Sequence, residues 1–199
     1  MSDAAASLAE PLACVTNSLF GETSYIEPGD KVLVVGPGAI GLISAQVARI
    51  QGGDVTLRGT DRDRQRLEVG ESLGFDISYA GDDLPKDSFD VAIECSGNMH
   101  GYADALRFLA KAGHLAQMGL SGADSSLPTD LICYKEITIT SGFASTPRSW
   151  RRAMRLMHSG KLDLQCLVSA TLPLSQWKEA FDRSFALDGV KFVLDPRLD

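Results

Sequence analysis

The stretch KVLVVGPGAIGLISAQVARI, residues 31–50, constrains the fold of this chain more than any other. A continuous apolar, β-branched run is followed by a turn with glycines at positions 36, 38 and 41. Apolar residues then recur at helical spacing. Such a run is typical of a strand buried on both faces of a parallel sheet. The stretch therefore predicts a strand, a tight turn and a helix in immediate succession.

The same alternation continues through the rest of the chain. Besides residues 31–35, strands are predicted at 54–60, 76–80, 89–95, 113–120, 136–143 and 190–196. Helices are predicted at 8–20 (with Gly21 as its stop), 38–50, 62–74, 102–112, 127–135, 146–160 and 172–187. Strands separated by helical stretches of about a dozen residues indicate βαβ units. The expected fold is α/β, a doubly wound parallel sheet (Rossmann fold) of about six strands with helices on both faces.

Composition excludes several classes of function. The net charge of −7 argues against a nucleic-acid partner, which normally requires a basic surface. The N-terminus lacks the features of a signal peptide, and no apolar run is long enough for a membrane span. The four cysteines form no C-x-x-C pair, and the three histidines have no metal-ligand spacing. A cytoplasmic protein with reduced thiols and no metal site of its own is expected.

The glycine turn matches the pattern G-x-G-x-x-G, whose glycines have distinct roles. Gly36 permits the tight turn, Gly38 lets a pyrophosphate approach the backbone, and Gly41 allows close packing of the helix. The free N–H groups and positive end of that helix then face the phosphates. The motif alone is weak evidence, but here a buried strand precedes it and an amphipathic helix follows.

Asp61 stands about 20 residues beyond Gly41, where dinucleotide-binding proteins hold the adenosine ribose. Its carboxylate can accept hydrogen bonds from both ribose hydroxyls and would repel a 2′-phosphate. This favours NAD over NADP. Four arginines near Asp61 leave the preference open, since any of them can pair with a 2′-phosphate: Arg58, Arg62, Arg64 and Arg66.

Two other classes of protein share parts of this pattern. Methyltransferases also place a glycine turn after the first strand, but the third glycine and the later βαβ order weigh against them. Short-chain dehydrogenases require Tyr-x-x-x-Lys for proton transfer. None of the four tyrosines is followed by lysine at the fourth position, where Gly29, Asp83, Leu106 and Thr138 stand instead.

The order and spacing of seven segments resemble the medium-chain dehydrogenase/reductase family of zinc alcohol and polyol dehydrogenases. These segments are EPLACVTNSL, PGDKVLVVGPGAIGL, TDRDRQRLEVGESLG, FDVAIECSGN, GHLAQMGL, KEITITSGF and KFVLDP. The resemblance covers nearly the whole chain and is strongest to the cofactor domain of the sorbitol and threonine dehydrogenase branch. It implies hydride transfer to NAD(P), with NADP the less expected of the two cofactors.

The resemblance also implies which residues contact the cofactor. Gly38, Ala39 and Ile40 meet the pyrophosphate, Asp61 holds the ribose, and Arg66 adds a basic ribose contact. Cys95, Ser96 and Gly97 line the adenine and ribose side. The nicotinamide half is implied to lie against Met118, Gly119, Leu120, Ser141, Gly142 and Phe143. Each group stands at the carboxyl end of a predicted strand.

The chain departs from the family in having no zinc ligands. Family members begin with a GroES-like catalytic domain of about 150 residues, which carries Cys and Gly-His-Glu ligands. Here the one Gly-His, at 113–114, is followed by Leu115. We therefore expect residues 1–26 to be a helical segment joining a missing catalytic domain, and 27–199 to be the NAD-binding domain. Zinc is expected only in the complete enzyme, where Glu10 would stand close to it.

The sequence is compatible with two functions. The first is the cofactor domain of a zinc-dependent alcohol, polyol or threonine-type oxidoreductase, inactive alone. The second is a binding module that holds NAD(H) without chemistry, as a redox-sensing partner. In either case the edge strand at 136–143 is expected to pair with its copy in a homo-oligomer.

Overall fold

The computed structural model of the chain describes residues 1–20, 26–124 and 126–199, so the predicted helix stop at Gly21 lies outside the described residues. Its main sheet contains β1 (Lys31–Val35), β2 (Asp54–Gly59), β3 (Asp76–Tyr79), β4 (Phe89–Glu94), β5 (Leu109–Gln117) and β6 (Thr138–Ser141). All neighbouring strands are parallel, in the order β3-β2-β1-β4-β5-β6. This order reverses direction between β1 and β4, as in a doubly wound sheet. The predicted fold class is confirmed.

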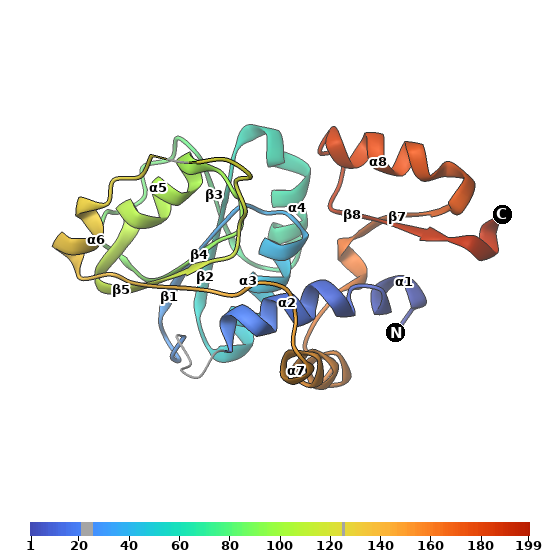
Figure 1. Ribbon diagram of the computed structural model, residues 1–199, viewed down its shortest axis with the longest axis horizontal. Coiled ribbons are helices and arrows are strands. Elements are labelled where there is room, and N and C mark those ends of the chain that lie inside the picture. The colour runs from blue at the N-terminus through green and yellow to red at the C-terminus, as the bar shows by residue number, and fades with distance from the viewer. Residues whose placement is uncertain (21–25, 125) are drawn as a thin grey trace.

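Helices cover both faces of this sheet (Figure 1). One core contains buried residues of α2 (Ala9–Leu19), α3 (Ala39–Gln51), α4 (Arg64–Ser72) and α7 (Pro147–His158). The opposite core contains α5 (Met99–Phe108), with α6 (Asp130–Lys135) packed against it. Alternate residues of β1 enter the two cores, Val32 and Val34 the first, Leu33 and Val35 the second. This alternation explains why the strand is apolar at nearly every position.

The C-terminal residues form a smaller unit beside the main sheet (Figure 1). Strands β7 (Val168–Pro173) and β8 (Lys191–Asp195) pair in parallel as a separate sheet, connected by α8 (Trp177–Phe185). The short helix α1 (Asp3–Ala6) lies against β7. Four 3₁₀ turns complete the described elements: Asp61–Asp63, Gln165–Leu167, Leu174–Gln176 and Pro196–Leu198. Strand β7 was not predicted, because the polar residues Ser169 and Thr171 interrupt its apolar pattern.

The helix predicted at 102–112 is displaced toward the N-terminus in the structure. Asn98 caps it by accepting a hydrogen bond from the backbone N–H of His100 at 2.8 Å, so α5 begins at Met99. The chain enters β5 at Leu109, which is fully buried and pairs with Phe89. Strand pairing therefore decides the state of residues 109–112, which sequence patterning alone assigned to a helix.

None of the helices among the described residues is long and apolar enough to span a bilayer.

Candidate functional site

A depression of about 560 Å³ opens at the carboxyl edge of the sheet, where the strand order reverses. Doubly wound proteins bind their ligands at this position. Its walls come from the glycine turn, the segment after β2, the segment after β4, and α5. The polar and glycine residues that line it are Gly36, Gly38, Arg58, Gly59, Thr60, Arg62, Asp63, Arg66, Ser96, Asn98, His100, Gly101 and Asp104, and Cys95 lines it too.

The glycine turn has no room for side chains at two of its positions. Gly36 has a φ of +97°, and a Cβ there would lie 2.6 Å from the backbone nitrogen of Ser96. A Cβ on Gly41 would lie 1.9 Å from the carbonyl oxygen of Gly36. Both glycines are therefore required for the strand, the turn and the helix to meet at these distances.

Gly38 differs, because an added Cβ would meet nothing within 4 Å. It is the N-cap of α3, and no side chain caps that end. Ala39 and Ile40 form the first residues of the helix. Open space therefore lies over unprotected backbone N–H groups at the positive end of α3, which is the environment that an anionic group prefers.

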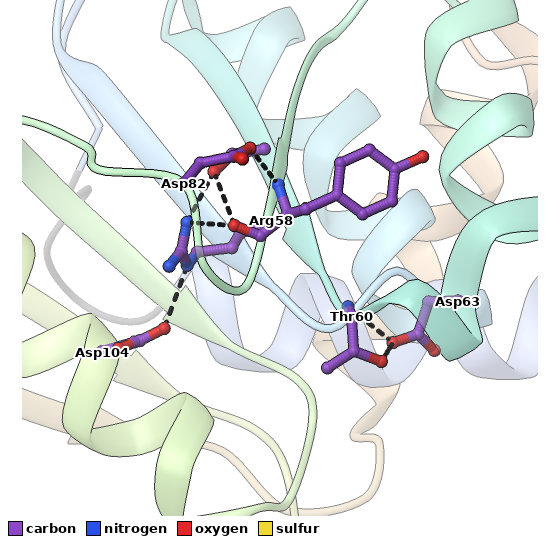
Figure 2. Close-up of polar contacts among 7 residues, drawn as sticks. Arg58, Thr60, Asp63, Asp82 and Asp104 are labelled. Atoms are coloured by element: carbon purple, nitrogen blue, oxygen red, sulfur yellow. Dashed lines mark hydrogen bonds and ion pairs between the residues drawn. The ribbon is translucent and has the colours of Figure 1, made fainter.

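The segment after β2 is held by a reciprocal cap (Figure 2). The carboxylate of Asp63 accepts hydrogen bonds from the backbone N–H of Thr60 at 3.0 Å and from its hydroxyl at 2.7 Å. The Asp61 side chain is 89% exposed, 3.7 Å from Arg64, and does not line the depression. The structure thus gives Asp63 the inward position, while the ribose contact of Asp61 stays a prediction.

Arg66 connects this segment to the C-terminal unit. Its Nε donates to the carbonyl of Gly189 at 2.8 Å, and its Nη1 lies 3.9 Å from the Asp63 carboxylate. Burial lowers the pKa of Arg66, and the nearby Asp63 partly offsets that effect. Arg66 therefore lines the depression with much of its hydrogen-bonding capacity already engaged.

Arg58 lies at the far wall of the depression, away from Thr60 and Asp63 (Figure 2). Its side chain is only 5% exposed, and its Nε donates to Asp104 of α5 at 3.0 Å. Its Nη1 donates to the Ser78 hydroxyl at 2.6 Å and to the Tyr79 carbonyl at 2.8 Å. The expectation that Arg58 clusters with Asp61 is wrong, because side chains alternate along β2 and Arg58 faces α5.

Glu94 holds together the segments that follow β4 and β5. This fully buried carboxylate accepts from the backbone N–H of Ser96 at 2.7 Å, that of Gly97 at 3.2 Å, and the Gln117 amide at 3.0 Å. A Cβ on Gly119 would lie 2.2 Å from the Gly97 nitrogen. Burial raises the pKa of the adjacent Cys95 thiol to about 12, and the charge of Glu94 adds to the effect.

The residues predicted for the nicotinamide half lie at the same sheet edge but outside the lining of this depression. The Met118 sulfur accepts a hydrogen bond from Ser44 at 3.6 Å, and Gly142 packs directly on Ser18. Ser141 pairs in register with Gln117. The side chains of Leu120 and Phe143 are 75% and 79% exposed. Their cofactor contacts remain predictions.

Glu10 lies in the first turn of α2 and is exposed. Its carboxylate accepts a hydrogen bond from the Cys14 thiol at 3.2 Å. Burial raises the pKa of Cys14 to about 11, with the hydrogen bond and charge of Glu10 adding to it. Among residues 1–20, 26–124 and 126–199, no group of three or more His, Cys, Asp or Glu side chains could hold a metal ion. These residues therefore do not fit a catalytic zinc.

Several residues of the depression are not predicted from the sequence, among them Thr60, Asp63, Asn98 and Asp104. The spacing Thr-x-x-Asp resembles a capping box and is a signal for the first two. Asn98 is recognisable as a helix cap once the start of α5 is known. Asp104 has no such signal, because only the packing of α5 on the sheet brings it to Arg58.

Known proteins with similar sequences are dehydrogenases. Residues 39–159 match the model of a family described as zinc-binding dehydrogenase. Sorbitol dehydrogenase of Halalkalibacterium halodurans is 33% identical over 207 residues, covering 98% of this chain and 59% of its own length. The chain thus spans little more than half of the curated relatives it matches.

Solved structures show the same fold. 2R,3R-butanediol dehydrogenase from Bacillus subtilis superposes with a TM-score of 0.85 at 21% identity, over 98% of this chain and 58% of that one. A protein from Sinorhizobium meliloti 1021, crystallised bound to NADP, superposes with a TM-score of 0.83 at 24% identity, over 96% and 59%. With the family match covering more than half of its residues, this chain belongs to the zinc-binding dehydrogenase family.

Proposed function

We propose that this chain is the dinucleotide-binding part of an alcohol-, polyol- or threonine-type oxidoreductase, and that its depression binds NAD(H). The observation that carries the proposal is the open backbone at Gly38, over the uncapped N-terminus of α3 and continuous with the depression. The pyrophosphate would lie there, and the adenosine would extend between the segments after β2 and β4. Hydride chemistry belongs to the nicotinamide, and the protein supplies its position.

NAD is the proposed cofactor in preference to NADP. Asp61 and Asp63 both follow β2, and Asp63 lines the depression, so a 2′-phosphate there would approach negative charge. Arg66 is already engaged by Gly189 and Asp63. Arg62 also lines the depression and is the residue most able to oppose this preference.

The substrate pocket and the catalytic zinc are proposed to come from polypeptide outside these 199 residues. The described residues do not provide a zinc site, and relatives are longer than this chain. A row of exposed aromatic side chains on α8 supports the proposal that further polypeptide packs here. These residues are Trp177, Phe181 and Phe185, which are 55%, 53% and 79% exposed. Rows of this kind commonly mark interaction surfaces.

Isothermal titration of the chain with NADH and NADPH tests the proposal. We expect saturable binding of NADH, weaker binding of NADPH, and no oxidation of polyols, secondary alcohols or threonine with or without zinc. Absence of heat with both dinucleotides in a folded sample would overturn it. Turnover by the chain alone would overturn the assignment of catalysis to other polypeptide.

A further inference from the structure

The ion pair between Arg58 and Asp104 forms a wall shared by two depressions. One is the 560 Å³ depression of the candidate site; the other lies outside it and is also lined by Ala80, Asp83 and Arg107. An arginine buried this deeply is unusual: Arg58 is only 4% exposed and the rest of β2 is mostly buried, while the Asp104 side chain is 29% exposed. Removing a charged group from water is costly unless it is paired and hydrogen-bonded.

The guanidinium of Arg58 is fixed on three sides. Asp104 holds Nε, the Ser78 hydroxyl and Tyr79 carbonyl hold Nη1, and the plane lies over the ring of Phe108 at 5.0 Å from its centroid. Little conformational freedom remains in the side chain. A ligand that contacts it would therefore meet a group that is already ordered.

Among the residues that the structure describes, the pair leaves one donor group and one acceptor atom without a hydrogen-bond partner. Nη2 of Arg58 makes no hydrogen bond to any residue that the structure describes, and Oδ1 of Asp104 accepts none from those residues. Neither atom is among the fully buried polar atoms that lack a hydrogen-bond partner, and both residues line the depression. The wall of the depression therefore carries a hydrogen-bond donor on Arg58 and an acceptor on Asp104.

The placement of the wall limits what can reach it. In the proposed function the phosphates lie at Gly38 and the ribose lies at the segment after β2. Beyond these, toward α5, the next part of a bound dinucleotide is the base. Adenine carries an amino group beside a ring nitrogen that accepts, which is the complement of Oδ1 and Nη2.

We infer that Asp104 and Arg58 recognise the adenine base, with the exocyclic amino group donating to Oδ1 of Asp104 and the neighbouring ring nitrogen accepting from Nη2 of Arg58. This inference rests on the proposed function, since it requires a dinucleotide in the depression. It adds a determinant that the glycine turn and Asp61 do not supply: selection of the base itself. Hypoxanthine has an oxygen in place of the amino group, so its oxygen would face Oδ1 of Asp104 and two acceptors would meet without a hydrogen between them.

The test compares NADH with reduced nicotinamide hypoxanthine dinucleotide by calorimetric titration of the intact chain. NADH is expected to bind about 10- to 100-fold more tightly, because a mismatched buried acceptor is costly. Equal affinities would overturn the inference while leaving the proposed function standing. If neither dinucleotide binds, both fail together.

The variant Asp104→Asn sharpens the comparison. Its amide oxygen can still accept from Arg58 Nε, and its NH₂ replaces the acceptor Oδ1 by a donor. Discrimination against hypoxanthine should fall to within about threefold or reverse. Asp83→Asn removes the same charge from an exposed residue that lines only the outer depression, and should discriminate like the unmodified chain. If folded Asp104→Asn still prefers NADH over the hypoxanthine dinucleotide as strongly as the unmodified chain does, the role of Asp104 is overturned. The comparison of the two dinucleotides on the unmodified chain tests the inference even if the variant does not fold.

Discussion

The Nε of Arg58 lies 3.0 Å from Oδ2 of Asp104, and this ion pair joins the second strand of the sheet to the helix that follows the fourth. Both residues line the depression at the point where the strand order reverses. The pair connects two parts of the chain that a dinucleotide would also bridge. The same two side chains therefore stabilise this edge of the sheet and line the candidate site.

Replacing Asp104 by Ala should lower the free energy of unfolding by about 2 to 4 kcal/mol, because Arg58 would remain buried without its counter-charge. Urea denaturation monitored by circular dichroism measures the change. Asp83→Ala is the matched control and should stay within about 0.5 kcal/mol of the unmodified chain. Similar stabilities for the two variants would show that the ion pair contributes little.

Alanine at Gly38 and alanine at Gly41 should affect different properties of the chain: the first its NADH affinity, the second its stability. The free energy of unfolding of Gly38→Ala should stay within about 0.5 kcal/mol of that of the unmodified chain. The φ of Gly38 is −69°, which any residue adopts, and nothing lies within 4 Å of the added methyl. Its NADH affinity should fall about tenfold or more, because the methyl occupies the phosphate position. Titration calorimetry and urea denaturation on the same sample separate the two effects.

Gly41→Ala is the complementary change. Its methyl would lie 1.9 Å from the Gly36 carbonyl oxygen, so the turn must deform. We expect a loss of stability of about 1 to 3 kcal/mol in the same urea experiment. A stable Gly41→Ala chain, or a Gly38→Ala chain that binds NADH normally, would contradict these roles.

Asp61→Ala tests the choice of cofactor. If the carboxylate repels a 2′-phosphate, the variant should bind NADH more weakly and NADPH more tightly, narrowing the ratio of the two affinities about five- to tenfold. Parallel titrations with both dinucleotides measure that ratio. An unchanged ratio would transfer the role to Asp63, which is the carboxylate that lines the depression.

The raised pKa of the Cys95 thiol lets us predict how the free energy of unfolding changes at alkaline pH. Burial raises its folded-state pKa from 9.0 to about 12, so between these values the unfolded chain loses a proton that the folded chain keeps. The free energy of unfolding should therefore decrease as pH rises from about 9 toward 12. Urea midpoints at pH 8 and pH 10 should differ less in Cys95→Ala than in the unmodified chain. Equal pH dependence would show that Cys95 is not responsible.

Strand β6 offers an unpaired edge, since it pairs only with β5 among the strands that the structure describes. We expect homodimers through this edge in sedimentation experiments at tens of micromolar chain. Ile139 is 37% exposed on β6, and Ile139→Lys should shift the chain to monomer. Leu198→Lys places the same charge on an exposed site far along the chain and should not. A monomeric unmodified chain would exclude this interface.

The sequence by itself determined the class of fold and the location of the candidate site. Apolar β-branched runs separated by amphipathic helices allow few arrangements other than a doubly wound parallel sheet, and the spacing of Gly36, Gly38 and Gly41 marked its phosphate-binding turn. These features are local, because each depends on side chains a few residues apart. Local periodicity also placed β1, β4 and α7 close to their observed bounds.

Tertiary structure decided the rest. It assigned residues 109–112 to a strand through pairing with β4, and it placed β7 and β8 in a sheet of their own. It turned Asp61 outward and Asp63 inward, and it carried Asp104 to Arg58 across 46 positions of sequence. Such contacts depend on how α5 packs against the sheet, a long-range property that no spacing of residues along the chain encodes.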